Sequence, residues 1–348
     1  RWHSVTGVQT CALPISAVPA LASGLISWLG AADADPYDAP VVLTPGAGMR
    51  RWLSQQIARA GGEGICAGVR FEPLAGLESL VSGRDPADGP WAPERLVWRV
   101  LELVDARTEG LEPLAHHLAA SEQRYANAAR VAFLLDRYAR LRPGLLQAWS
   151  DAASPDDLGL GFDTWQPVLW RALHTCVPGP DPVRRRAALL AELAAGRGAL
   201  DAPAIGVFCP RQLTEPDADL LAALAAGRRV DAWLRVAGPA ASEHPLAVRL
   251  GSRGAETAAL LAERAASVVD LGTPTRPATL LGALQEDLAL GRAPEPRKLA
   301  TGHRSLRVHA SHAPDRQAEV LREVLAGLFA DDPTLEPRHV VVACPDPG

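Results

Sequence analysis

The residues with the clearest chemical potential form the loop Pro45-Gly46-Ala47-Gly48, which follows a short apolar run and precedes a helical pattern. Backbone N–H groups at the start of a helix, together with the helix dipole, can hold a phosphate. A Walker-type ATPase loop also needs a lysine after its glycines, and the one lysine, Lys298, follows residues 294–297, which contain no glycine. The loop is therefore either a tight turn or a phosphate loop without catalysis. The remnant of the motif would be Gly46, Gly48, Met49 and Trp52.

Arginines gather in two segments with helical periodicity. Between Arg124 and Arg142 there are five arginines and one acid, Asp136. A second run, residues 184–186, opens a helix after Pro182, where each cation costs about 0.3–1 kcal/mol against the helix dipole unless an anion compensates it. Because arginine engages phosphates and stacks on bases, both segments are candidates for contact with a nucleic acid. A solvated helix face is the alternative.

Composition excludes several other classes. The 348 residues carry a formal charge of -5, so the chain as a whole is not a polybasic binder of nucleic acid or membranes. Its five cysteines form no CxxC pair, and no cysteine or histidine stands at the spacing of a metal site. A D/E-x-K nuclease motif is missing as well, because Pro296 stands two residues before Lys298. We therefore expect no catalytic residue, no metal site and no cofactor in this chain, and a cytoplasmic location. Tryptophans at apolar positions are predicted to be core: Trp52, Trp98, Trp165, Trp170 and Trp233.

The elements that would position these residues follow an α/β pattern. Strands are predicted over residues 40–44, 68–71, 204–209 and 229–236, with helices over 74–81 and 217–226. Helical periodicity dominates residues 92–200. The prediction is thus an α/β domain with a parallel sheet, made of residues 17–91 and 201–238, with a large helical insertion between its two parts.

The two ends of the chain are read differently. Residues 1–16 read like a translated sequencing adapter, so we expect them to be non-native and leave them out of the fold. Residues 239–302 are predicted to be a connecting helical region, with helices over 257–269 and 280–290. Residues 303–348 are expected to be the truncated start of a second α/β domain, with strands over 305–310 and 339–343 around a helix over 315–329.

Six segments, in collinear order, resemble the N-terminal part of the RecC family, the gamma subunits of the RecBCD helicase-nuclease, exodeoxyribonuclease V. The segments are residues 48–53, 134–143, 165–170, 244–246, 305–321 and 332–338. The resemblance implies a helicase-like fold with a degenerate P-loop, which agrees with the missing lysine. It also implies a non-catalytic subunit that splits duplex DNA at double-strand breaks and scans the 3′ strand for a Chi-like signal.

The same resemblance implies partners and site residues. The partners would be a RecB-like beta subunit and a RecD-like alpha subunit, which use ATP and Mg²⁺, together with DNA ends and single-stranded DNA. Four residues match positions that read the signal in this family: Leu134, Asp136, Arg142 and Arg186. The sequence departs from the family pattern at Pro45, Ala47, Arg51, Phe133 and Arg137, so the signal recognised here can differ. Two alternatives are a stand-alone ATP-dependent helicase or nuclease of AddB type and an unrelated α/β nucleotide-binding enzyme.

Overall fold

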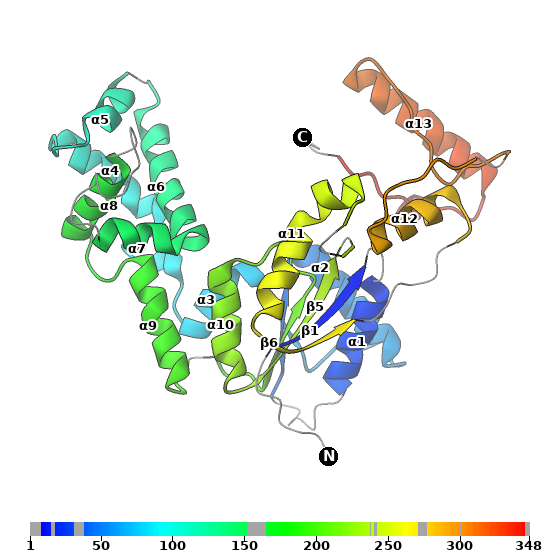
Figure 1. The fold of residues 1–348 in the computed structure, drawn as a ribbon, viewed down its shortest axis with the longest axis horizontal. Coiled ribbons are helices and arrows are strands. Elements are labelled where there is room, and N and C mark those ends of the chain that lie inside the picture. Colours follow the sequence, from blue (N-terminus) through cyan, green and yellow to red (C-terminus); the bar gives the residue numbers. More distant parts are fainter. Residues whose placement is uncertain are drawn as a thin grey trace. The chain divides into compact units, whose positions relative to one another are not determined.

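The computed structural model describes residues 8–14, 18–30, 38–120, 122–151, 165–198, 200–236, 238–239, 242–270, 277–298 and 301–344. The chain divides into two units (Figure 1). The first contains residues up to Thr275 together with Gln285–Pro294, and the second contains Arg276–Leu284 together with Glu295–Gly348.

The first unit is built on a six-stranded parallel sheet with the order β3-β2-β4-β5-β1-β6. Its strands are β1 (Val8–Pro14), β2 (Val41–Thr44), β3 (Arg70–Pro73), β4 (Ala204–Phe208), β5 (Arg229–Val236) and β6 (Ala265–Asp270). Parallel strands need long crossover connections, and the helices supply them. This confirms the predicted α/β class with a parallel sheet.

Helices cover both faces of the sheet and form the insertion. They are α1 (Val18–Gly30), α2 (Ala47–Ala60), α3 (Leu77–Ser82), α4 (Pro93–Asp105), α5 (Glu112–Ala119), α6 (Arg124–Leu141), α7 (Pro143–Asp151), α8 (Trp165–Cys176), α9 (Pro182–Ala194), α10 (Glu215–Ala225) and α11 (Pro245–Ala262). Two further helices are α12 (Leu280–Leu290), which spans the boundary between the two units, and α13 (Pro314–Asp331), which belongs to the second unit. Short 3₁₀ turns lie at Leu74–Gly76, Pro86–Asp88 and Pro337–His339.

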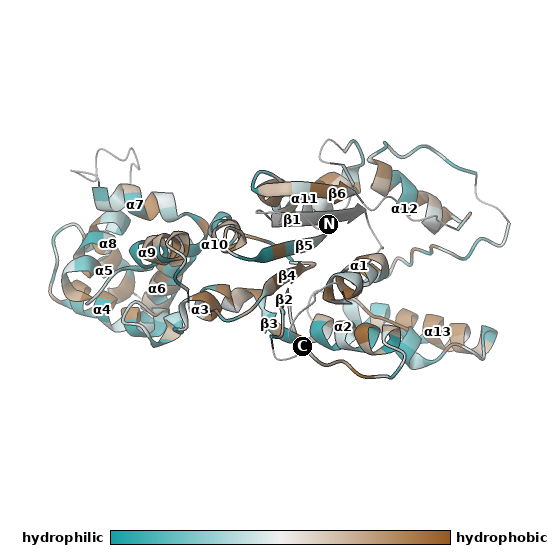
Figure 2. Cartoon of the chain, turned by 90° about the horizontal axis from the view of Figure 1, so that it is seen from below, coloured by the Kyte–Doolittle hydropathy of each residue, from teal (hydrophilic) through white to brown (hydrophobic). Residues whose placement is uncertain are grey.

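Successive side chains of the strands point to opposite faces of the sheet and so belong to two separate hydrophobic cores. Val41 and Leu43 of β2 pack with α3, α10 and α11 on one face, whereas Val42 packs with α1 and α2 on the other. Figure 2 shows α10 and α1 on opposite sides of the strands. Because successive strand side chains point to opposite faces, a fully apolar strand such as β2 is what a sheet covered on both faces requires.

The helical insertion has a core of its own. Eighteen buried residues from α4 to α8 and their connections pack together, among them Trp149 and Trp170, which are fully buried. Helices α4 to α8 form one bundle (Figure 1). The insertion meets the sheet layer through α9 and α6, which contact α10. The predicted helical character of residues 92–200 is confirmed for the described residues.

Buried polar side chains hold α1 to the sheet. The indole Nε1 of Trp28 donates to Oδ2 of Asp231, 2.6 Å away, and the guanidinium of Arg229 donates to the same oxygen and lies 5.5 Å from the Trp28 ring centroid. Burial raises the pKa of the Asp231 carboxyl, and the Arg229 charge opposes that rise. This network is the main polar contact between α1 and β5.

Two expectations for the first unit are wrong. The helix predicted over residues 257–269 ends at Ala262, and Ala265–Asp270 form β6 instead, so the sheet continues beyond residue 238. Residues 1–16 were excluded from the fold, yet Val8–Pro14 form β1 between β5 and β6. Strand pairing uses backbone N–H and C=O groups, so neither strand needs a strong side-chain pattern once a neighbour is in place.

The second unit contains α13, but the two predicted strands beside it are absent. Residues 305–310 and 339–343 are not assigned to strands, and Val308 and Val341 are each 90% exposed. A β-branched run becomes a strand only where another strand satisfies its backbone. None of the described residues of this unit supplies such a neighbour.

Candidate functional site

A cleft of about 760 Å³ opens at the carboxyl ends of β2, β3 and β4. Helices α6 and α9 of the insertion form one wall, and the ends of the strands with α3 form the other. In open α/β sheets, ligands bind outside the carboxyl ends of the strands. The cleft is therefore the candidate site on architecture alone.

The charged side chains lining the cleft come from segments far apart in sequence. Five are arginines: Arg137, Arg140, Arg185, Arg186 and Arg211. Five are acids: Glu78, Asp85, Glu94, Asp136 and Asp217. The described lining contains no histidine, cysteine or lysine. The arrangement is suited to binding charge rather than to acid–base chemistry.

Two arginines share one carboxylate in this cleft. Arg186 Nη2 donates to Glu78 Oε2 at 2.5 Å, and Arg185 Nε donates to Glu78 Oε1 at 3.1 Å. Arg186 and Glu78 are 13% and 14% exposed. Arg186 Nε and Nη1 are buried and have no acceptor among the described residues. Two cations on one anion leave one positive charge in excess at this point of the cleft, which favours an anionic ligand.

The other cleft arginines differ in how they are paired. Arg140 forms an i,i+4 ion pair with Asp136 on α6. Arg137 and Arg211 are exposed, and neither has an ion-pair partner among the described residues. Asp217 is held in the capping box of α10 with Thr214, whose side chain accepts from the Asp217 backbone N–H. Arg137 and Arg211 are thus the most available cations of the cleft.

The structure brings together only part of the predicted site. Asp136 and Arg186 both line the cleft. Leu134 is half-buried and Arg142 is exposed at the end of α6, and neither belongs to the lining. Among the departing positions, Pro45, Phe133 and Arg137 line the cleft, whereas Ala47 and Arg51 line a separate hollow on α2.

The loop predicted to be the remnant of a phosphate loop is a short turn between β2 and α2. β2 ends at Thr44, α2 begins at Ala47, and Gly46 precedes it without a side-chain cap. A Cβ on Gly46 or Gly48 would meet nothing within 4 Å. Met49 and Trp52 pack against the core under α1. Only the start of this loop, Thr44 and Pro45, reaches the cleft.

The arginine run at residues 184–186 is partly compensated within the protein. Asp181 caps α9 by accepting from the N–H groups of Val183 and Arg184, and its carboxylate lies 3.4 Å from Arg184 Nε. Glu78 compensates Arg185 and Arg186. Internal acids thus neutralise part of the positive charge at the start of α9. Sequence reasoning missed Glu78 because it stands 107 residues before Arg185 and carries no local signal.

One tryptophan position, Trp98, departs from what its apolar sequence pattern predicts. Trp170 and Trp233 are buried as predicted, but Trp98 is 58% exposed and lies against Tyr125, with ring centroids 5.4 Å apart. The prediction of a core role is therefore wrong for Trp98. Its apolar neighbours in sequence, Val97 and Val100, are buried, so α4 turns Trp98 outward.

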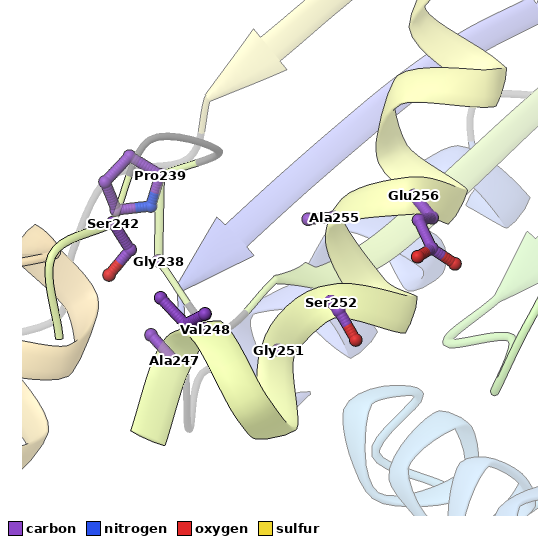
Figure 3. A pocket seen from close by; sticks show the side chains of 9 residues that line it. All are labelled: Gly238, Pro239, Ser242, Ala247, Val248, Gly251, Ser252, Ala255 and Glu256. Carbon is purple, nitrogen blue, oxygen red and sulfur yellow. The ribbon is translucent and has the colours of Figure 1, made fainter. Parts of the chain in front are cut away.

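A second hollow, of about 300 Å³, lies beside the first half of α11 (Figure 3). Small residues line it, including Gly251, Ser252 and Ala255, and Glu256 is the one ionisable side chain in its lining. It offers no constellation of chemical groups comparable to the cleft.

Cys209, at the end of β4, is expected to be an unreactive thiol. Its backbone has φ of 44°, unusual for a residue with a side chain, and burial raises its pKa to about 12, a rise that the nearby Arg235 charge opposes. At pH 9 its thiolate fraction should be about 500-fold below that of a cysteine whose pKa is 9.0. Iodoacetamide labelling followed by mass spectrometry should modify Cys66 long before Cys209. Equal labelling rates in the folded protein would contradict this.

The described residues form neither a metal centre nor a membrane-spanning helix. No group of three or more histidines, cysteines or acids is arranged to hold a metal ion. No described helix is both long and apolar enough to cross a membrane.

Comparisons with known proteins identify relatives. The family model described as RecC, N-terminal domain, matches residues 17–239. RecBCD enzyme subunit RecC of Mycobacterium tuberculosis (strain H37Rv) is 39% identical over 375 residues, and that of Mycolicibacterium smegmatis is 36% identical over 363; each alignment covers 94% of this chain. The subunit of Escherichia coli (strain K12) is 22% identical over 397 residues, covering 90%. The alignments cover 33%, 32% and 34% of these relatives, so the chain spans about a third of their length.

Proposed function

The chain belongs to the RecC family, and from this we propose that it is the DNA-strand-binding N-terminal part of a RecBCD-type complex. A RecB-like and a RecD-like subunit would supply helicase and nuclease activity with ATP and Mg²⁺, in the cytoplasm. This chain would help to split duplex ends and would hold the emerging 3′ strand while it is scanned for a Chi-like signal.

One observation carries the proposal. The cleft at the carboxyl ends of β2 to β4 holds Arg185 and Arg186 on the single carboxylate of Glu78. Arg137 and Arg211 add exposed positive charge at the same cleft. Phosphates are the natural ligands of such a site, because guanidinium groups bind phosphate oxygens in a bidentate way. The base-contacting roles fall to Asp136 and Arg186, an acceptor and a donor within the same cleft.

Binding should be measured as the affinity of the 348-residue chain for a fluorescent single-stranded oligonucleotide at several salt concentrations. Arg137→Gln and Arg211→Gln are expected to weaken binding to all sequences, each lowering the salt slope by about one. Arg253→Gln is the matched control, because Arg253 is exposed on α11 and does not line the cleft. Unchanged affinity in both cleft variants would refute the cleft as the binding site.

Recognition of the DNA base sequence is tested by comparing the affinities for two oligonucleotides. Asp136→Asn and Arg186→Lys should change the ratio of affinities between two oligonucleotides of different sequence, whereas the phosphate-contact variants should leave that ratio unchanged. ATP hydrolysis by the purified chain would instead favour the stand-alone helicase alternative.

A further inference from the structure

Three large aromatic side chains are exposed on neighbouring helices of the insertion. Trp98 on α4 is 58% exposed, and Tyr125 and Phe133 on α6 are 51% and 45% exposed. The rings of Trp98 and Tyr125 are tilted by 50°. Tyr125 and Phe133 stand eight residues apart, about 12 Å along one side of the helix. We call these three residues the aromatic stripe. Trp98 and Tyr125 form one exposed apolar patch, and such a patch is a candidate interaction surface.

The stripe is continuous with the cleft. Phe133 lines the cleft together with Asp136 and Arg137 of the same helix. On α4, Glu94 lines the cleft one turn before Trp98, on the same side of the helix. The stripe therefore starts at the cleft wall and runs outward along α6 and α4.

The helices that carry the stripe have a positive net charge, whereas the chain as a whole is negative. Helix α6 carries four arginines and one aspartate, and helix α4 carries two arginines and three acids, so the two helices together are positive, while the chain has a formal charge of -5. Arg124 pairs with Asp105, and both side chains are well exposed. Exposed ion pairs of this kind are weak and screened by salt, so a phosphate can replace the carboxylate at little cost. The surroundings of the stripe thus match an anionic polymer.

We infer that the aromatic stripe is a stacking platform for a single-stranded nucleic acid that leaves the cleft along α6. Unpaired bases stack on aromatic rings irrespective of sequence, while arginines track the backbone. A duplex would not bind the stripe in this way, because its bases are already stacked on one another. This inference rests on the proposed function, since the strand is the one held in the cleft, and it adds a contact that does not depend on sequence.

The test compares oligothymidylates of about 6 and about 20 nucleotides, the shorter able to fill the cleft alone. Trp98→Leu and Tyr125→Leu in the full 348-residue chain should each weaken binding of the longer oligomer about five- to 150-fold. Binding of the shorter oligomer should not change, and neither should the salt slope, because stacking releases no counterions. Trp98→Phe should retain most of the affinity. Ile65→Ser is the control for loss of apolar surface, since Ile65 is 63% exposed away from the cleft lining.

The outcomes separate the two proposals. If the leucine variants bind both oligomers as the wild type does, while Arg137→Gln and Arg211→Gln lose affinity, the stacking platform is overturned and the cleft stands. The same holds if the leucine variants bind DNA normally but lose association with a partner subunit, because the stripe is then a protein contact. If the wild type binds neither oligomer, the proposed function fails and the inference fails with it.

Discussion

Replacing Glu78 with glutamine should weaken the folded state and strengthen binding to single-stranded DNA. The carboxylate is the shared partner of Arg185 and Arg186 and is 14% exposed. Removing its charge leaves two guanidinium groups poorly compensated where water has little access. Breaking a largely buried ion pair by losing one partner costs about 3–5 kcal/mol of unfolding free energy.

The same change should raise DNA affinity, because the cleft loses a negative charge and Arg186 Nη2 is released from a competing acceptor. We expect the salt slope of binding to become steeper by about one. Urea unfolding and a salt series of binding curves measure the two effects. Glu192→Gln is the matched control, with the same charge change at an exposed position of α9. Loss of both stability and affinity would show that Glu78 supports the strand site rather than competing with it.

Truncating Trp28 to alanine should be among the most damaging single changes in the sheet domain. Its side chain is 5% exposed, packs edge-on against Trp233 with ring centroids 5.4 Å apart, and donates to Asp231. Large-to-small changes of this kind cost about 3–5 kcal/mol. Asp231, itself 5% exposed, would also lose one of its donors, which adds about 1 kcal/mol or more.

Thermal or urea unfolding of three variants resolves these contributions. Trp28→Phe keeps a ring but removes the donor, so its smaller loss measures the hydrogen bond. Trp98→Ala removes the same side chain from an exposed position and should cost less than about 1 kcal/mol. Similar losses for Trp28→Ala and Trp98→Ala would contradict the burial seen at these two positions.

The sequence predicted those parts of the fold that depend on local patterns. β2 and β5 follow from apolar β-branched runs, and the helices of the insertion follow from their 3.6-residue periodicity. β6 was missed because its short Ala-Ala-Ser-Val-Val-Asp run is a strand only beside β1. The extended runs in the second unit show the opposite error, since their β propensity finds no neighbouring strand among the described residues.

Part of the candidate site could be predicted from the sequence, and part could not. The family resemblance drew attention to Asp136 and Arg186, which the fold brings into one cleft, and also to Leu134 and Arg142, which do not line it. Glu78 could not be found from sequence, because its pairing with Arg185 and Arg186 depends on how the insertion packs against α3. Tertiary packing, not local pattern, decided each of these cases.

The position of β1 has a consequence for how the protein is handled. The family match begins at residue 17, but the strand that joins β5 to β6 is formed by Val8–Pro14. A version trimmed to the family boundary would leave a vacancy one strand wide, with about 10 Å between the two facing backbones. Such an open slot accepts an added strand from any extended peptide, including one from a neighbouring molecule. Trimming at residue 17 should therefore favour strand exchange between molecules.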